Sequence, residues 1–333
     1  MSARLEVGVI GLGVMGQRML ARLEGHARLQ ATQVWDADPH AVARTLAAYP
    51  RLKAAANAEA LIATPGLASL YIATPPAPHM ALSNRAFDAG LAVLCEKPLT
   101  VDVAAARQAI ARIAREGQRA AVNFSLASSA GLAAMQAALQ PGPQGALGTL
   151  QAGRIELAFA AWPRPWQAAA GAWLSERAEG GFTREVLSHF IFVLQRLLGP
   201  ATVRASTPVY PADGRGAETA LSAQLEAGGV PVSIEARVGG DADDVNRMTL
   251  QGSAGEIELR NWFGVYRRRA GADWDSLGDP AELRTRGQVD QLTQWVALID
   301  GEPHGLPGFA EALAVQETIE ALLHPSVTGH GLR

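Results

Sequence analysis

The chain has 333 residues, which predicts two domains at about 150 residues per domain. Hydrophobic residues make up 48% of the chain and charged residues 18%, so the composition supports packed cores and excludes a disordered protein. The 29 basic and 32 acidic residues give a net charge of −3, which excludes the strongly basic surface of a nucleic-acid-binding protein. A single cysteine, Cys95, excludes an internal disulfide and a multi-cysteine metal site, and we expect no metal cofactor.

The N-terminus and the uncharged stretches predict where the protein works. The first residues lack the basic segment and apolar run of a secretion signal. The uncharged stretches 61–84 and 120–153 are interrupted by prolines or polar residues, so neither holds the run of about 20 apolar residues that crosses a membrane. We therefore expect a cytoplasmic protein with no membrane partner.

Strands and helices alternate in the first part of the chain. Apolar runs predict strands at 7–10, 29–35, 70–73, 91–94 and 120–124. The intervening patterns predict helices at 13–24, from 38 onward, at 79–89 and at 100–115, the last with Thr100 as its N-cap. Such alternation indicates a parallel sheet covered on both faces. We expect this α/β domain to span residues 1–124.

Strands with two-residue alternation dominate the rest of the chain, residues 125–333. After a helix at 128–139 and a proline break at 141–143, they are predicted at 149–159, 201–209, 218–227, 230–238, 247–251, 256–260 and 265–269. Helices at 288–300 and 309–323 finish the chain, and they are free to pack back on the first domain. We expect an α+β domain with an open, mainly antiparallel sheet. Because helices cover one face of such a sheet and both faces look partly apolar, we expect a homodimer or homotetramer.

A glycine-rich loop follows the first strand and opens the first helix. It comprises Gly11, Leu12, Gly13, Val14, Met15 and Gly16. Its glycines permit a tight turn, close approach of a pyrophosphate, and close helix–strand packing. Asp36 lies 20 residues beyond Gly16, where a carboxylate can bind an adenosine ribose. We expect a Rossmann domain that binds NAD, with NADP disfavoured because Arg44 is the only basic residue near Asp36.

Two further loops follow strands at the carboxyl edge where α/β sheets bind ligands. The first comprises Ala73, Thr74, Pro75 and Pro76 and leads to His79, and the second is Glu96-Lys97-Pro98. Either loop could be only a stiff surface connection. However, Lys97 is one of two lysines in a chain that otherwise uses arginine, and an ammonium can exchange a proton near neutral pH whereas a guanidinium cannot. We expect both loops to contact the cofactor.

Paired glycines at 180–181 precede a helical pattern that holds Glu185 and His189. These two side chains lie four residues apart on one helical face, so they are either a stabilising pair or a histidine that titrates near neutrality beside a carboxylate. The preceding segment holds Arg164, Trp166 and Trp173. Its aromatic rings are either core packing or the lining of a substrate pocket, in which Arg164 or Arg184 would bind an acidic group.

These motifs, in this order, resemble those of the Gfo/Idh/MocA oxidoreductases. The resemblance covers the whole length and is carried mainly by residues before 125. It implies an N-terminal Rossmann domain, a C-terminal open-sheet domain and a nicotinamide dinucleotide. It also implies that Lys97 and His189 are catalytic. The chain differs from the family pattern in having Glu185 in place of an aspartate, and Leu187 and Phe192 at two other positions.

We therefore expect an NAD(P)-dependent oxidoreductase that transfers hydride between a nicotinamide cofactor and a secondary alcohol or ketone of a sugar, polyol or related hydroxy compound. Lys97, His189 and Glu185 are the expected catalytic residues. The expected substrate contacts are Lys97, Asn123, Arg164, Trp166, Trp173, Arg184 and His189. Two alternatives remain open. The protein could be a non-catalytic dinucleotide-binding regulator, or a reductase of an imine or a conjugated double bond.

Overall fold

The computed structural model describes residues 4–140, 147–240 and 243–325, so the predicted break at 141–143 lies outside the described residues. The chain divides into two compact units. The first unit comprises residues up to Ser128 and Gly287–Leu313. The second comprises Ser129–Arg286 and the residues from Ala314 onward.

The first unit is built on a six-stranded sheet in which every described strand pair is parallel. In spatial order the strands are β3 (Lys53–Ala54), β2 (Leu29–Trp35), β1 (Leu5–Ile10), β4 (Leu67–Ile72), β5 (Ala92–Cys95) and β6 (Ala120–Val122). The order reverses between β1 and β4, and the loops after these strands meet at that point, where doubly wound sheets bind ligands. The predicted parallel α/β domain is confirmed.

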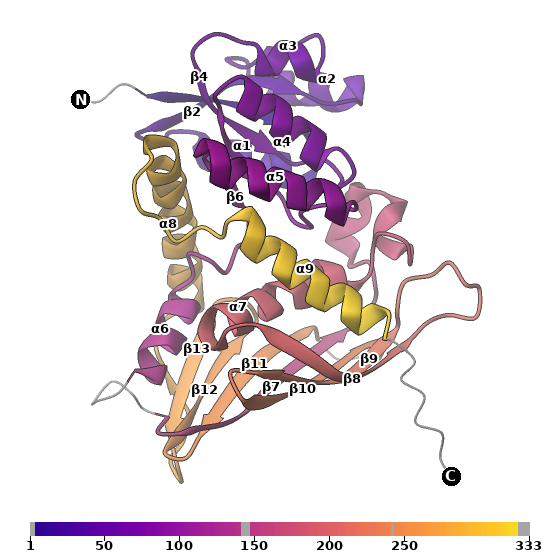
Figure 1. Ribbon diagram of the computed structural model, residues 1–333, viewed down its shortest axis with the longest axis vertical. Helices are drawn as coiled ribbons and strands as arrows, with labels where there is room; N and C mark the ends of the chain where they lie inside the picture. The colour runs from indigo at the N-terminus through magenta and orange to yellow at the C-terminus, as the bar shows by residue number, and fades with distance from the viewer. Residues whose placement is uncertain (1–3, 141–146, 241–242, 326–333) are drawn as a thin grey trace. The chain divides into compact units, whose positions relative to one another are not determined.

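Helices alternate with these strands, as the sequence pattern predicts (Figure 1). They are α1 (Val14–Leu23), α2 (Pro39–Ala48), α3 (Ala58–Ile62), α4 (His79–Asp88) and α5 (Val103–Glu116). Asp102, and not Thr100 as predicted, caps α5, because its carboxylate accepts a hydrogen bond from the Ala105 N–H at 3.0 Å. The Thr100 hydroxyl instead accepts from the Asp102 N–H at 2.8 Å.

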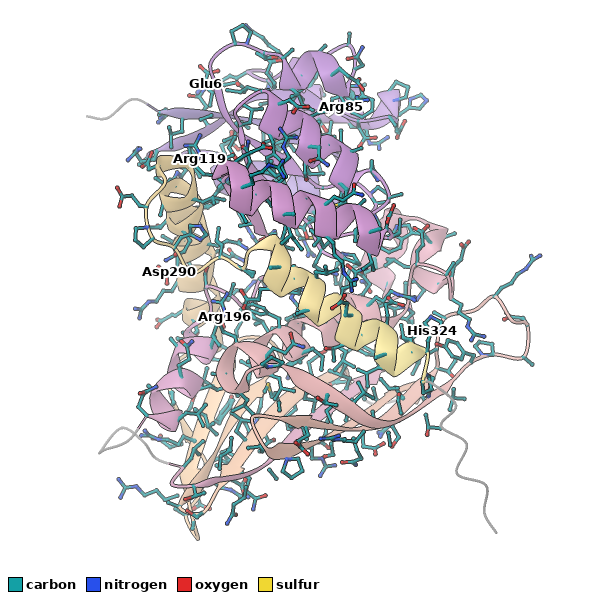
Figure 2. The ribbon with its side chains drawn as sticks, in the orientation of Figure 1. Glu6, Arg85, Arg119, Arg196, Asp290 and His324 are labelled. Carbon is teal, nitrogen blue, oxygen red and sulfur yellow. The ribbon has the colours of Figure 1, made fainter. Side chains whose placement is uncertain are left out.

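The long helix α8 (Pro280–Asp300) contributes to the core of the first unit. Its Trp295 is fully buried, lies 5.9 Å from the Tyr71 ring, and donates a hydrogen bond to Ser69 at 3.0 Å. Near the end of the helix, Arg119 (labelled in Figure 2) donates to the carbonyl of Ile299. Helix α8 begins eight residues earlier than the predicted start at 288 and passes from the second unit into the first at Gly287.

The second unit is built on an eight-stranded mixed sheet. In spatial order its strands are β14 (Asp275–Ser276), β13 (Gly264–Arg269), β12 (Gly255–Arg260), β11 (Val245–Gly252), β7 (Leu150–Phe159), β10 (Val230–Val238), β9 (Ala220–Ala227) and β8 (Ala201–Val209). The β7–β10 pair is parallel and the other pairs are antiparallel. This confirms the predicted open, mainly antiparallel sheet.

Helices α6 (Ala130–Leu139) and α7 (Ser188–Leu198) lie on one face of this sheet, and α9 (Phe309–Leu323) follows α8 (Figure 1). Gly131 lets α6 approach β12 closely, because a Cβ there would collide with the Leu259 side chain. The segment between β7 and α7 contains the 3₁₀ turns η1 (Pro165–Ala170) and η2 (Ala172–Ser175), followed by the π turn η3 (Thr183–Leu187).

The opposite face of the second sheet is charged, which corrects the expectation that both faces are partly apolar. Cross-strand and neighbouring ion pairs cover it: Arg268 with Glu256 at 2.8 Å, Arg154 with Glu156 at 2.8 Å, and Arg260 with Glu258 at 2.5 Å. The alternating residues that point to the helices, such as Leu250 and Ile257, are fully buried. This sheet therefore has one apolar face and one ion-paired face.

In the described parts of the chain, no helix is both long and apolar enough to span a membrane. Over the same residues, the histidine, cysteine and acidic side chains form no group of three or more that could hold a metal ion.

Candidate functional site

The glycine loop between β1 and α1 has the shape of a phosphate cradle. Gly11 has a positive φ of +94°, and a Cβ there would collide with the backbone of Ala73. A Cβ at Gly16 would collide with the Gly11 carbonyl oxygen. At Gly13, by contrast, a Cβ would meet no atom within 4 Å, and this residue is exposed. Two glycines are thus required by packing, whereas Gly13 leaves open space at the start of α1, where unpaired N–H groups bind phosphates.

Asp36 is fastened to this loop at the end of β2. One carboxylate oxygen accepts a hydrogen bond from the Leu12 N–H at 2.6 Å, and the other accepts from the Asp38 N–H at 2.8 Å. Arg44 lies 3.6 Å from Asp38 in an exposed ion pair, so it is turned to a second carboxylate. A negative charge therefore stands beside the phosphate cradle with its nearest basic residue already paired.

These residues fit a dinucleotide. The loop from Gly11 to Gly16 would hold the pyrophosphate, with Gly13 giving close backbone approach, and Asp36 would hold the adenosine ribose through its remaining acceptor positions.

His79, at the start of α4, joins the two other predicted ligand loops. It is fully buried, and its ring nitrogens lie 2.9 Å from the Pro98 carbonyl oxygen and 3.0 Å from the Thr74 carbonyl oxygen. Burial lowers the pKa of this imidazole, although the carbonyl contacts oppose the shift. The structure therefore places His79 between the loops as a bridge that fixes their separation, and its expected contact with the cofactor stays a prediction.

Glu96 is buried beneath the second loop. Its Oε1 accepts hydrogen bonds from the Tyr71 hydroxyl and from the Asn123 amide at 2.6 Å, and its Oε2 accepts from the Lys97 N–H at 3.3 Å. Burial raises the pKa of the Glu96 carboxyl, while its hydrogen-bond donors oppose the rise. The carboxylate thus anchors the backbone from which the half-buried Lys97 side chain extends.

The network beneath Lys97 extends into α8. Gln291 donates to the Asn123 carbonyl oxygen, and Arg22 donates to Gln291 at 2.8 Å. Asn123 is 3% exposed, and both ends of its amide are engaged within the protein. The structure therefore gives Asn123 a role in this buried network, and its expected contact with substrate stays a prediction.

Cys95, at the end of β5, is fully buried, as the sequence predicts. Burial and the neighbouring Glu96 carboxylate raise its pKa well above the usual range, so it remains a thiol and not a reactive thiolate.

In the second unit, the paired glycines lead into a π turn instead of a regular α-helix. Gly181 has a φ of +100°, and a Cβ there would collide with the carboxylate of Glu218. That carboxylate, from the segment before β9, accepts a hydrogen bond from the Thr183 N–H at 2.7 Å. Glu185 lies within the π turn and His189 within α7, so the regular four-residue helical spacing predicted for this pair is corrected. π turns of this kind are frequent at functional sites.

Arg184 is used inside the protein. Its guanidinium donates to both oxygens of Glu320, at 2.7 and 2.8 Å, and to the carbonyl oxygens of Arg177 and Gly180. The side chain is buried. Four of its five N–H groups are therefore occupied, which fits an anchor for the glycine turn better than the expected contact with an acidic substrate.

Arg164 lies close to two of the tryptophans before the glycine turn, because its guanidinium is 5.6 Å from the Trp162 ring and also lies near Trp166. Trp162 is half-buried; it packs edge-to-face on the buried Phe159 and donates to the Leu174 carbonyl at 3.0 Å, so it covers the edge of the core. Arg164 lies 4.8 Å from the ring of Trp166, which is 48% exposed. Trp173 is half-buried in η2. Of the expected substrate contacts in this segment, Arg164 and Trp166 are therefore brought together.

Two residues of this site were missed by the sequence analysis. Glu218 caps the start of the π turn, and the Trp262 ring lies 5.0 Å from the His189 ring. Both come from segments without a recognisable motif. The only sequence signal was an acidic residue and a tryptophan beside strands of alternating pattern, which is too weak to single them out.

Known proteins of similar sequence match mainly the first unit. Residues 5–124 match the family model described as an oxidoreductase family with an NAD-binding Rossmann fold, Gfo/Idh/MocA. Inositol 2-dehydrogenase from Pseudomonas fluorescens is 33% identical over 144 residues, 41% of this chain and 42% of the relative. A 1-carboxy-3-chloro-3,4-dihydroxycyclo hexa-1,5-diene dehydrogenase from Comamonas testosteroni is 32% identical over 97 residues, 29% of this chain and 24% of the relative. The matched segments thus span less than half of these relatives.

Solved structures resemble both units. A putative myo-inositol dehydrogenase from Sinorhizobium meliloti has a TM-score of 0.75 at 21% identity, covering 95% of each chain. An oxidoreductase from Agrobacterium radiobacter, solved with NAD⁺, L-tartaric acid and magnesium, has a TM-score of 0.81 at 16% identity, covering 96% of this chain and 95% of that one. At these identities the likeness shows the fold alone. Together with the glycine cradle and Asp36, the match over residues 5–124 shows that this part of the chain is similar to the NAD-binding Rossmann fold of the Gfo/Idh/MocA oxidoreductases.

Proposed function

We propose that the protein is an NAD-dependent oxidoreductase that transfers hydride between its cofactor and a secondary alcohol or ketone of a sugar, polyol or related hydroxy compound. The observation that carries this proposal is the open cradle at Gly13 beside the fastened carboxylate of Asp36. The substrate class is supported by relatives named as inositol 2-dehydrogenases, which match part of the chain.

The chain's own groups supply the proton chemistry in this proposal. When bound, a nicotinamide cofactor held by the glycine loop and Asp36 would supply the hydride chemistry. His189 takes the proton of the substrate hydroxyl, and Glu185 orients the imidazole. Lys97 polarises the reacting oxygen and relays its proton, which its ammonium can do and a guanidinium cannot. The buried Glu96 network holds the Lys97 backbone in place for this task.

The remaining ligand contacts belong to the same proposal. We assign residues 1–124 to cofactor binding and residues 125–333 to substrate binding and oligomerisation. The proposed cofactor contacts are Gly11, Leu12, Gly13, Val14, Met15, Gly16, Asp36, Ala73, Thr74, Pro75, Pro76, Glu96 and Lys97. The proposed substrate contacts are Lys97, His189, Arg164, Trp166 and Trp173.

A panel of polyols, sugars and cyclitols, incubated with NAD⁺ and followed by NADH absorbance, tests the proposal. We expect turnover of at least one member. Lys97→Arg should retain NADH binding and the thermal midpoint but lower kcat by about 10²-fold or more, the range for a lost acid–base group. NADH binding without turnover of any alcohol, ketone, imine or conjugated alkene would instead identify a dinucleotide-binding regulator. Turnover of an imine or alkene alone would identify the other reductase class.

We further propose a cytoplasmic homodimer or homotetramer. The second sheet supports self-association, since α6 and α7 contact one of its faces, the opposite face presents exposed charged side chains such as Arg154, and twofold dimers are the commonest oligomers. Light scattering should give a mass of at least twice 35.0 kDa, and this mass should fall at high salt. A single-chain mass at micromolar concentration would contradict the proposal.

A further inference from the structure

The turn between β12 and β13 has an unusual backbone. Asn261 and Trp262 have positive φ values of +48° and +75°, and they are the non-glycine residues with positive φ in the described ranges. Hairpin turns that need this conformation normally use glycine or asparagine, because a Cβ crowds the adjacent carbonyl. Asparagine at the first position follows that preference, whereas a tryptophan at the second does not. The sequence thus keeps a bulky aromatic residue where glycine would fit the backbone better.

The surroundings hold the turn in this conformation. The strands pair up to Arg260 and Gly264, which face each other across the hairpin. The Asn261 N–H donates to the Asn246 carbonyl at 2.7 Å, which ties the turn to β11. Strained residues persist where neighbouring structure fixes them, and they cluster at sites where the strained side chain has a task. The strained backbone of Trp262 therefore suggests a task for its indole ring, which its contacts should reveal.

The Trp262 indole packs against α7 at the candidate base. Its centroid lies 5.0 Å from that of His189 with the rings at 79°, and 5.7 Å from that of Phe190. His189 is 6% exposed. A near-perpendicular arrangement is favourable for aromatic pairs, and it excludes the imidazole from the volume that the indole occupies. The side chain that strains the turn is therefore the one whose ring contacts His189.

We propose that Trp262 is a positioning residue that fixes the orientation of the His189 imidazole for proton transfer. The inference rests on the proposed function, in which His189 takes the substrate proton. A glycine at position 262 would suit the turn but would leave the imidazole free to turn into the vacated space. Misplacing a catalytic group by about 1 Å can lower a rate by about 10²-fold. A gain of that size in the rate of proton transfer can offset the loss of stability that the strained turn causes.

The test compares substitutions at Trp262 with a matched change elsewhere. Trp262→Leu and Trp262→Gly remove the ring, and the second also relieves the turn. Trp262→Phe keeps an aromatic ring. Trp274→Leu is the control, because Trp274 is another half-buried tryptophan of the same sheet, packed between the guanidinium groups of Arg260 and Arg268. Thermal unfolding of each variant establishes that it is folded.

The first readout is independent of activity. In protein labelled with ¹³C-histidine, the ring C–H signals of His189 are assigned by comparison with His189→Asn. We expect an indole ring-current shift in the wild type that is lost in Trp262→Leu and Trp262→Gly, partly kept in Trp262→Phe, and unchanged in Trp274→Leu. An unchanged His189 signal in the variants that lack the ring would overturn the inference.

The second readout is kinetic, with a substrate found in the panel above. We expect kcat to fall at least tenfold in Trp262→Leu and Trp262→Gly, with KM within threefold of wild type, and Trp262→Phe to recover most of the activity. Normal kcat without the ring would overturn the positioning role even if the signal moved. If no substrate is turned over at all, the proposed function fails. Whether Trp262 orients the ring is then decided by the nuclear Overhauser contacts of the His189 ring protons to residues other than Trp262, which should change in Trp262→Leu and Trp262→Gly and stay as in the wild type in Trp274→Leu; unchanged contacts would overturn the inference.

Discussion

Gly13→Ala should separate cofactor binding from folding. Gly13 lies at φ −71° and ψ −162°, a conformation open to alanine, and its added Cβ would meet no atom within 4 Å. Alanine in place of glycine restricts the unfolded chain and stabilises the protein by about 0.4–1 kcal/mol. The weaker N-cap opposes this by a comparable amount. The thermal midpoint should therefore change by no more than about 4 °C.

Cofactor affinity should respond quite differently. The methyl group would occupy the space through which a pyrophosphate approaches the backbone, so we expect NADH to bind at least about tenfold more weakly, or about 1.4 kcal/mol. NADH fluorescence titration measures the affinity. Gly308→Ala is a matched control, since a Cβ there also meets nothing within 4 Å. Gly16→Ala should instead destabilise the protein by about 1–3 kcal/mol, because its Cβ collides with the Gly11 carbonyl. If folded Gly13→Ala bound NADH with wild-type affinity, the assignment of this loop as the pyrophosphate-binding site would be wrong.

Three further outcomes follow from the structure. NADH should bind at least about tenfold more tightly than NADPH, because Asp36 repels a 2′-phosphate and Arg44 is paired with another carboxylate. Tighter binding of NADPH in a calorimetric titration would contradict this prediction. Gly181→Ala should lower the free energy of unfolding by about 1–3 kcal/mol through collision with Glu218, so an unshifted denaturant midpoint would show that the turn can relax. Burial lowers the pKa of His79 below its ordinary value of 6.5, so its stabilising contribution is present above pH 6.5 and is lost as pH falls towards the folded-state pKa, at up to about 1.4 kcal/mol per pH unit. A His79 NMR signal that titrates above 6.5 would contradict the sign.

Much of the first unit could be predicted from the sequence because its signals are local. The strand before Gly11, the helix after it and Asp36 at the end of the next strand all lie within one β–α–β segment, where period and glycine spacing determine the fold. The same holds for the buried strand end at Cys95.

The parts that the sequence did not predict depend on long-range contacts or on backbone irregularity. Gln291 completes the network around Asn123 from 168 residues away, and nothing near either residue indicates it. The π turn that contains Glu185 has the amino-acid composition of an ordinary α-helix, so the sequence does not distinguish the two. The positive φ of Trp262 is imposed by a hairpin that its own side chain disfavours. Arg184 was expected in a substrate site because its charge was visible in the sequence, whereas its partner Glu320 was not recognisable.

The most direct test of the central claim follows the hydrogen itself. The hydroxy substrate found in the panel is deuterated at its carbinol carbon and incubated with the protein and NAD⁺, and the reduced cofactor is analysed by mass spectrometry. We predict one deuterium in each NADH formed, as direct hydride transfer from the carbinol carbon requires. Protein that binds NAD⁺ but forms no deuterated NADH from any substrate of the panel would contradict the assignment as an alcohol-oxidising enzyme.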